Sequence, residues 1–271
     1  MTRRLAVIGV GNMAKAIING IISSNLEVSQ INLYDKNEEC YKPFLKNKTF
    51  YIADSIAEAV KDADCVLLAV KPQNYFEVLE IISGVPCHSE KIYISIGAGI
   101  TVDSVSKALN GAKVVRVLPN LPMTIGKGLS AICRSQQISK TDFDFVESLF
   151  SVAGSTILID ENEMNRIIGV TSSSPAYVFK FIDAICKGAK SQGLELEDKA
   201  LIDAICDVVI GAAELLKGST VSPSELIAKV ASKGGTTEQA LLKLDEFDFD
   251  NILKDAMVAC TRRAEKLGEN N

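Results

Sequence analysis

The chain has 271 residues, enough for one large domain or two smaller ones that each bury a core. Its hydrophobic fraction of 47% and charged fraction of 23% are ordinary for a soluble globular protein. The net charge is −5 and no basic block is present, which argues against a nucleic-acid partner and requires local donors for any anionic substrate. Because no apolar run approaches the roughly 18 residues of a membrane helix, we expect no membrane span.

The cysteines and the single histidine give no sign of a disulfide framework or a metal centre. Seven cysteines are scattered without a Cys-x-x-Cys pair, which is typical of free thiols in a reducing compartment, so we expect a cytoplasmic protein. The short apolar run at 5–10 leads into glycines without a cleavage site, and we interpret it as a strand, not a signal peptide. His88 falls in an expected loop as a surface group, and we expect no metal site.

The first half of the sequence alternates short apolar runs with helical patterns. In chain order we expect strands at 5–10, 31–34, 65–70, 92–96 and 114–118, helices at 14–23 and 55–61, and late strands at 129–133 and 156–159. Short, fully apolar strands separated by helices indicate a parallel sheet covered on both faces. The pattern predicts an α/β fold class, with a Rossmann-type, doubly wound parallel sheet in an N-terminal domain of residues 1–161.

The second half, residues 162–271, is expected to be an all-helical domain. Apolar residues recur at helical spacing over 163–192, 198–216, 237–244 and 250–267. Ser222 and Pro223 mark the start of a further helix, as its N-cap and a first-turn residue. Such an apolar helical unit is expected to bury a face against a second copy of the chain, which predicts a homodimer; a self-contained bundle is the alternative.

A glycine-rich turn follows the first strand and opens the first helix. It contains Gly9, Gly11, Asn12, Met13 and Ala14. Glycines allow a tight turn and let the backbone approach a pyrophosphate, while the helix N-terminus supplies amide donors and the positive end of its dipole. Because the turn lies in the first βαβ unit, we predict that these residues bind a dinucleotide cofactor.

Asp35 ends the second expected strand, 24 residues after Gly11, near the usual spacing for a ribose-binding acid. A carboxylate at this place accepts hydrogen bonds from both ribose hydroxyls and repels a 2′-phosphate. The sequence therefore favours NADH, and NADPH remains the alternative because the neighbouring Lys36 could offset that repulsion. The other interpretation of Asp35 is an ordinary turn residue.

Small or charged residues also follow other expected strands, and ligands in doubly wound folds bind beyond these carboxyl ends. The strand at 92–96 runs into glycine and alanine, whose small size lets a flat nicotinamide ring pack against the backbone. A loop of the same kind is found at 116–122. From these loops we expect cofactor contacts at Ala69, Val70, Lys71, Pro72, Gly97 and Ala98.

The helical half carries one polar turn before a helix start. It is formed by Ser232, Lys233, Gly234, Gly235, Thr236 and Thr237. Free amides at a helix N-terminus, together with hydroxyl groups, make a good cradle for a carboxylate. The turn is therefore a candidate substrate site, with a simple helix cap as the alternative.

These motifs, in this order, resemble those of the pyrroline-5-carboxylate reductase family from about residue 5 to residue 267. The matching segments are 8–14, 69–73, 98–100, 116–122, 173–179 and 234–237. The last two are the specific ones, because many dehydrogenases share the first. The resemblance implies a Rossmann domain followed by a helical dimerisation domain, an active site at their junction, and higher oligomers built from dimers.

The same resemblance implies a reaction, in which NAD(P)H transfers hydride to the C=N bond of 1-pyrroline-5-carboxylate and gives L-proline. The carboxylate of this small cyclic imino acid would bind at Ser232, Lys233, Gly234, Gly235 and Thr236. Thr237 would be the catalytic hydroxyl near the ring nitrogen; since a threonine is a poor acid, we expect it to position the imine or relay a proton. Lys71 is the other candidate, but its place at a strand end fits cofactor contact better.

Three departures from the family pattern bear on the pocket and the cofactor. Ser172 and Ser174 stand where the family often has glycine, and could narrow the pocket. Lys233 replaces a usual proline, and either adds charge for a carboxylate or points to solvent. Ile56 replaces an asparagine that many members have near the adenosine ribose, which bears on cofactor affinity and choice because isoleucine cannot form that hydrogen bond.

Two other functions remain open from the sequence. A hydroxyacid dehydrogenase of the same two-domain plan would need a lysine on the first long helix of the second domain, where Lys180 and Lys187 occur without the expected surrounding motif. A catalytically silent, dinucleotide-binding regulator is the second alternative, because the added serines could have closed the pocket.

Overall fold

The computed structural model describes residues 2–24 and 26–269. The chain forms two compact units. The first unit contains Met1–Ser173 and Met257–Asn271, and the second unit contains Ser174–Ala256. The domain boundary at residue 161 remains a prediction; the first unit extends past it and also takes in the end of the last helix.

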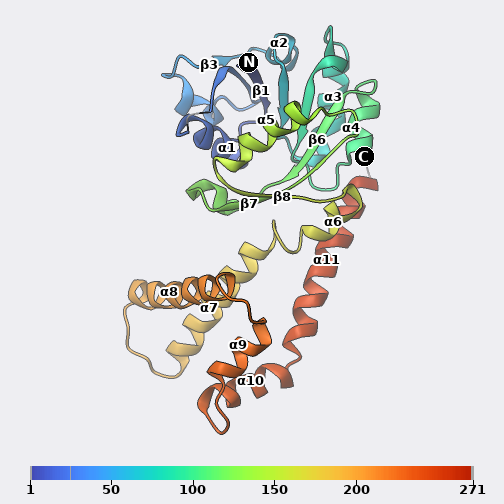
Figure 1. The fold of residues 1–271 in the computed structure, drawn as a ribbon. Coiled ribbons are helices and arrows are strands. Elements are labelled where there is room, and N and C mark those ends of the chain that lie inside the picture. The colour runs from blue at the N-terminus through green and yellow to red at the C-terminus, as the bar shows by residue number, and fades with distance from the viewer. Residues whose placement is uncertain (1, 25, 270–271) are drawn as a thin grey trace. The chain divides into compact units, whose positions relative to one another are not determined.

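In the described residues, the first unit is built on an eight-stranded sheet of order β3-β2-β1-β4-β5-β6-β7-β8 (Figure 1). The strands are β1 (Arg3–Ile8), β2 (Val28–Tyr34), β3 (Phe50–Ile52), β4 (Cys65–Leu68), β5 (Ile92–Ser95), β6 (Lys113–Leu118), β7 (Gly128–Arg134) and β8 (Gly154–Leu158). The predicted Rossmann-type sheet is confirmed, except that β6 and β7 run antiparallel. Only residues 119–127 separate these two strands, which is too short for the crossover that a parallel return requires.

Helices cover both faces of this sheet. On one face lie α1 (Asn12–Ile22) and α5 (Lys140–Ser151), and on the other lie α2 (Ile56–Lys61), α3 (Tyr75–Ser83) and α4 (Val102–Ala108). Successive residues of β1 point to opposite faces, so that Leu5 and Val7 join one core while Ala6 and Ile8 join the other. Because both faces are buried, this strand is a continuous apolar run without polar alternation.

The sequence analysis did not predict β3, α3, α4 or α5. The signal for α3 was present, since its buried residues Tyr75, Val78, Leu79 and Ile82 follow helical spacing. By contrast, β3 has three residues and is too short to show a period. The remaining elements of the unit are short: η1 (Glu38–Cys40), η2 (Lys42–Phe44), η3 (Pro72–Asn74), η4 (His88–Glu90), η5 (Leu121–Ile125), η6 (Glu161–Glu163) and α6 (Met164–Ile167).

The second unit is helical, as predicted. It contains α7 (Ser174–Ser191), α8 (Asp198–Lys217), α9 (Pro223–Val230), α10 (Thr236–Glu246) and the first part of α11 (Phe249–Glu269). Ser222 caps α9 in a reciprocal capping box with Glu225, which confirms the predicted helix start. The helical pattern expected over 163–192 is divided into α6 and α7, because Pro175 has no amide hydrogen for a helix running through it.

The helices of the second unit expose many large apolar side chains. Phe179 is 56% exposed, Val208 71% and Val230 69%. Within the part of the chain that the structure describes, no helix combines the length and the apolar character that crossing a bilayer requires. Exposed apolar surface of this kind marks a face that another protein covers.

Candidate active site

The first turn brings the end of β1 against the end of β4. Gly9 has a φ of 90°, and a side chain there would place its Cβ 2.8 Å from the carbonyl oxygen of Ala69. Its amide donates to the carbonyl oxygen of Tyr34, at the end of β2, over 2.8 Å. Only glycine permits this approach, because other residues disfavour this φ and would collide with the backbone. The turn thus joins the carboxyl ends of three strands.

Gly11, the N-cap of α1, faces open space instead. Its φ of −73° suits any residue, and an added Cβ would meet no described atom within 4 Å. The fold therefore does not require glycine here, whereas a ligand that approaches the first amides of α1 does. Of the next residues, Asn12 is exposed, while Ala14 and part of Met13 pack into the core, so these two can offer only backbone groups to a cofactor.

A cavity of about 290 Å³ opens at the carboxyl ends of β1, β2 and β4. It is lined by Ile8, Gly9, Gly11, Tyr34, Asp35, Lys36, Ile56, Ala69, Val70, Lys71, Asn74 and Val78. Sites for whole small molecules are typically about 300–1,000 Å³, so this cavity suits one end of a dinucleotide. The structure therefore brings seven of the sequence-predicted cofactor residues together, and their contact with a cofactor stays a prediction.

Asp35 holds the glycine turn through both of its carboxylate oxygens. Oδ2 accepts from the amide of Val10 at 2.6 Å, and Oδ1 accepts from the amide of Asn37 at 2.9 Å. An ionised carboxylate has about four acceptor positions, so it retains capacity for ribose hydroxyls. The two interpretations of Asp35 from the sequence, turn residue and ribose ligand, are therefore compatible.

Two lysines and an isoleucine at the cavity bear on the choice of cofactor. Lys36 Nζ pairs with Glu77 Oε1 at 3.0 Å, and both groups are largely exposed. Lys71 is the exposed N-cap of η3. Ile56, which is 5% exposed, adds an apolar wall beside the cavity. The cavity thus has one carboxylate, one lysine already paired with an acid, a second exposed lysine, and an apolar side.

The loop 96–101 links β5 to α4 and carries Gly97 and Ala98, the predicted nicotinamide contacts. Gly97 is buried, and a Cβ there would lie 2.7 Å from a ring carbon of Tyr75. Ala98 is half-buried and lines a second cavity of about 360 Å³ with Ser173 and Arg263. Because β5 pairs with β4, the loop continues the sheet edge that begins at the glycine turn.

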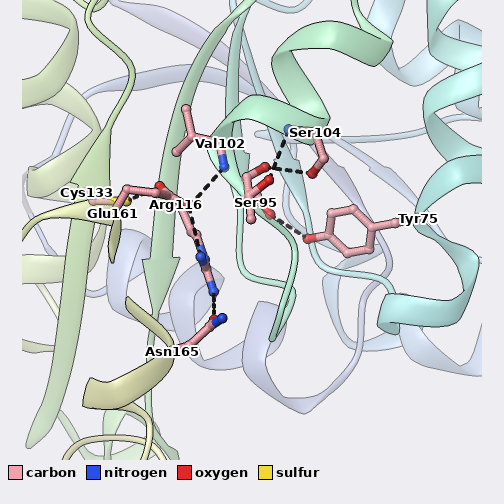
Figure 2. A network of polar contacts seen from close by, with 9 residues as sticks. Tyr75, Ser95, Val102, Ser104, Arg116, Cys133, Glu161 and Asn165 are labelled. Atoms are coloured by element: carbon pink, nitrogen blue, oxygen red, sulfur yellow. Dashed lines mark hydrogen bonds and ion pairs between the residues drawn. The ribbon is translucent and has the colours of Figure 1, made fainter. Parts of the chain in front are cut away.

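A polar network fastens this loop to the sheet (Figure 2). Arg116 of β6 is 1% exposed; its Nη1 donates to Glu161 Oε1 at 2.9 Å and its Nη2 to Asn165 Oδ1 at 2.7 Å. Glu161 Oε1 also accepts from the amide of Val102 at 3.2 Å, and Oε2 accepts from the Cys133 thiol at 2.8 Å. Burial, together with the hydrogen bond to Glu161, raises the pKa of Cys133, so the thiol remains a donor.

Tyr75 forms a second polar contact at the loop. Its hydroxyl donates to the carbonyl oxygen of Leu68 at 2.6 Å and accepts from Ser95 Oγ at 3.2 Å, which ties β4 to β5. Burial raises the pKa of Tyr75 to about 12, so the hydroxyl stays neutral at physiological pH. The tyrosine ring that leaves no room for a side chain at Gly97 is thus held in place at its hydroxyl end.

The loop after β6 has a structural contact at Asn120. Its buried Nδ2 donates to the carbonyl oxygen of Thr171 at 3.0 Å, and its Oδ1 accepts from the amide of Leu129 at 2.9 Å. Ser172, one of the departures from the family pattern, donates to the carbonyl oxygen of Pro119 at 3.3 Å. The added hydroxyl of Ser172 therefore has a hydrogen-bond acceptor within this unit.

In the second unit, the polar turn before α10 holds a carboxylate of its own chain. The amide of Gly234 donates to Glu238 Oε2 at 2.7 Å. Gly235 is the N-cap of α10, and a Cβ there would lie 2.9 Å from the carbonyl oxygen of Ser232, so the turn favours glycine. Lys233 is exposed, and Thr236 and Thr237 open the helix. The Gly234 amide thus donates to a carboxylate of the same helix start, as the helix-cap alternative also predicts, and substrate binding at this turn stays a prediction.

The sequence analysis missed the residues that position the predicted ones. Tyr75, Glu161 and Asn165 were not singled out, and Arg116 was noted only as part of a loop motif. One signal was available, because a single arginine inside the apolar strand 113–118 must be buried and must have an acidic or amide partner. Glu161 lies 45 residues further along the chain, and no spacing rule connects the two.

Known proteins are similar to the chain over almost its whole length. A family model for pyrroline-5-carboxylate reductase dimerisation matches residues 161–267, and one for coenzyme F420-dependent NADP oxidoreductases matches residues 4–99. The pyrroline-5-carboxylate reductase of Haemophilus influenzae is 33% identical over 266 residues, with 97% of each chain covered. These matches cover both halves of the chain.

Two solved structures have a similar fold. The 1-pyrroline-5-carboxylate reductase of Streptococcus pyogenes aligns with a TM-score of 0.88 at 26% identity, covering 98% of this chain and 99% of that one. The pyrroline carboxylate reductase of Plasmodium falciparum, solved with NADP bound, aligns with a TM-score of 0.88 at 24% identity, covering 98% of both. The similarity to the second structure is evidence for the fold alone.

We predict that Gly11→Ala separates cofactor binding from folding. Because the added methyl meets no described atom, the melting temperature should stay within about 2 °C of the wild type. The dissociation constant for NADH should rise at least roughly tenfold, since the methyl fills the space by which a pyrophosphate approaches. Thermal melts and fluorescence titration measure the two effects. Gly84→Ala, at the C-cap of α3, is the matched control; unchanged NADH binding in Gly11→Ala would contradict the assignment.

Proposed function

Because the chain belongs to the pyrroline-5-carboxylate reductase family, we propose that it reduces the C=N bond of 1-pyrroline-5-carboxylate to give L-proline. The reaction makes it an NAD(P)H-dependent oxidoreductase acting on CH–NH groups. The proposal rests on one observation. The same chain has a glycine turn of the dinucleotide-binding type at a cavity in its first unit, and a turn whose amide binds a carboxylate in its second unit.

When bound, a reduced nicotinamide dinucleotide supplies the hydride that reduces the imine carbon. The open space at Gly11 and the first amides of α1 fit its pyrophosphate, and the small residues of loop 96–101 fit its flat ring. We assign cofactor contacts to Gly9, Gly11, Asn12, Met13, Ala14, Asp35, Lys36, Ala69, Val70, Lys71, Pro72, Gly97 and Ala98. The protein thereby holds the ring in place and supplies no redox group of its own.

NADH is the proposed cofactor, with NADPH as the alternative. The carboxylate of Asp35 lines the cavity and would repel a 2′-phosphate. Lys36 could offset that repulsion, but its charge is partly neutralised by Glu77. The pair is exposed and stabilises by at most about 1 kcal/mol, so it biases the choice against NADPH without preventing NADPH binding.

For the substrate, we assign carboxylate binding to Ser232, Lys233, Gly234, Gly235 and Thr236. The contact of Glu238 with the Gly234 amide supports this role, because the substrate carboxylate would take over a donor that already binds one. Thr237 follows directly, and its hydroxyl would hydrogen-bond the ring nitrogen, orienting the imine and keeping its proton in place. A protonated imine is the more electrophilic form, so this hydrogen bond favours hydride transfer.

We further propose a homodimer that functions in the cytoplasm and assembles into higher oligomers. The exposed apolar side chains of the second unit support the dimer, because a monomer would leave Phe179, Val208 and Val230 in water. The dimerisation description of the family model at residues 161–267 supports it as well. Size measurement by light scattering tests the oligomer.

The proposed activity is tested by following NADH absorbance with purified protein and 1-pyrroline-5-carboxylate. We expect NADH oxidation with this imine and no reduction of NAD with hydroxyacids. Reduction of NAD by a hydroxyacid would support a hydroxyacid dehydrogenase instead. Cofactor binding without turnover on either class would support a silent regulator, and would refute the proposal.

We predict that Asp35→Asn shifts cofactor preference towards NADPH. The amide keeps an oxygen for the Val10 amide but removes the charge that repels a 2′-phosphate. The ratio of kcat/KM for NADH to that for NADPH should fall roughly tenfold. Glu77→Gln, which releases Lys36 and leaves Asp35 intact, should move the ratio the same way by a smaller factor. An unchanged ratio in Asp35→Asn would remove this carboxylate from the ribose site.

We predict that Thr237→Ala lowers turnover much more than cofactor affinity. Loss of the hydroxyl removes orientation of the imine, so kcat should fall roughly tenfold or more while the KM for NADH stays within about twofold. Thr237→Ser retains a hydroxyl and should keep most of the activity. Steady-state kinetics with both substrates varied makes the measurement; equal losses in kcat and in NADH affinity would count against the role.

A further inference from the structure

The loop 96–101 is held at three points by contacts within the first unit. At its start, Gly97 lies so close to Tyr75 that a Cβ would come within 2.7 Å of the ring. In its middle, a Cβ on Gly99 would lie 2.4 Å from the carbonyl oxygen of Ala264 in α11. At its end, Glu161 accepts a hydrogen bond from the amide of Val102. The first two contacts are steric; the third is directional and polar.

The contact at Val102 satisfies a specific donor. Val102 is the first residue of α4, and the amides of a first helical turn have no partner within the helix. The side chain of the N-cap Thr101 accepts from the amide of Ser104 at 3.1 Å, and the amide of Val102 donates to Glu161 at 3.2 Å. Glu161 comes from η6, so this hydrogen bond joins the end of the loop to a segment 59 residues away.

Arg116 fixes the place of that carboxylate. The guanidinium is 1% exposed, and Glu161 is its charge partner at 2.9 Å. A buried charge is strongly unfavourable without its counter-ion, so the arginine holds Glu161 in place. Cys133 donates to the second oxygen at 2.8 Å, which sets the rotation of the carboxylate. Figure 2 shows these groups converging on Glu161 between the strands and the start of α4.

We propose that Glu161, held by Arg116, is a positioning residue. It fixes the position of loop 96–101 relative to the sheet and thereby the position of the nicotinamide ring. The inference rests on the proposed function, because the contacts of Gly97 and Ala98 with the ring belong to that function. A displacement of the ring by about 1 Å can slow hydride transfer by as much as ~100-fold, so the loop must be held firmly. In this proposal Glu161 acts through its hydrogen bond to Val102 at the end of the loop.

Two variants weaken the contact in different ways. Glu161→Gln keeps the size of the side chain and an oxygen for Val102 but removes the charge that Arg116 requires. Val102→Pro removes the amide donor itself and leaves both charges in place. Proline is favoured at the first helical position, and Thr101 before it is extended, with φ −83° and ψ 157°, as a residue preceding proline must be. Val102→Pro is therefore expected to fold even if Glu161→Gln does not.

The test compares binding of NADH with binding of ADP-ribose, which lacks the nicotinamide. The adenosine end is assigned to the cavity at Asp35, and loop 96–101 is no part of its lining. In both variants we expect the dissociation constant for NADH to rise several-fold and kcat to fall roughly tenfold, while the dissociation constant for ADP-ribose is unchanged. Glu163→Gln, which removes the nearby exposed pair with Arg166, is the matched control and should equal the wild type.

Equal weakening of NADH and ADP-ribose, or wild-type NADH binding and turnover in folded Val102→Pro, would overturn the inference. A general structural role would weaken both ligands together, so the difference between them is the discriminating readout. Failure of the proposed function can be distinguished from failure of the positioning role. In that case the wild-type protein binds NADH but does not oxidise it in the presence of the imine. The binding comparison needs no imine substrate and decides the positioning role in either case.

Discussion

The candidate cofactor site depends on two close approaches of the backbone that leave no room for a side chain. At Gly9 the end of β1 lies against the Ala69 carbonyl, and at Gly97 the loop after β5 lies against the Tyr75 ring. At both places a side chain is excluded, so the two segments are held in fixed positions by packing against the backbone. Asp35 on the Val10 amide and Glu161 on the Val102 amide fasten these same segments.

Arg116 is the least expected group in the sheet. Moving a charge out of water costs several kcal/mol, and the central strands β4 and β5 avoid this because they contain no charged side chain. Glu161 and Asn165 offset the penalty only in part, since Nε has no hydrogen-bond partner among the described residues. An apolar residue would pack the strand at least as well, so stability alone does not account for the arginine, whereas the proposed positioning role of Glu161 does.

Local pattern was enough to predict the Rossmann-type sheet, the helical second half and the capping of α9, because each is encoded in neighbouring residues. The same pattern placed Gly9, Asp35 and Lys71 at strand ends, and these residues line one cavity because the strand ends of a parallel sheet meet at one edge. It missed the antiparallel β6–β7 pair, although the segment 119–128 between the two expected strands was already too short for a parallel crossover. Nor could it find Glu161, whose role depends on a contact across 45 residues with Arg116.

The last helix has a consequence for biosynthesis. The first unit contains residues from both ends of the chain, and the backbone of α11 at Ala264 and Gly268 packs against Gly99. The strands are synthesised before residues 257–271, so loop 96–101 has no packing partner on that side until the end of α11 has been made. Domains generally fold as they emerge, N-terminal first. Here the contact at Gly99 can form only once residues 264–268 have been synthesised, so this side of the loop is packed later than the sides that contact Tyr75 and Glu161.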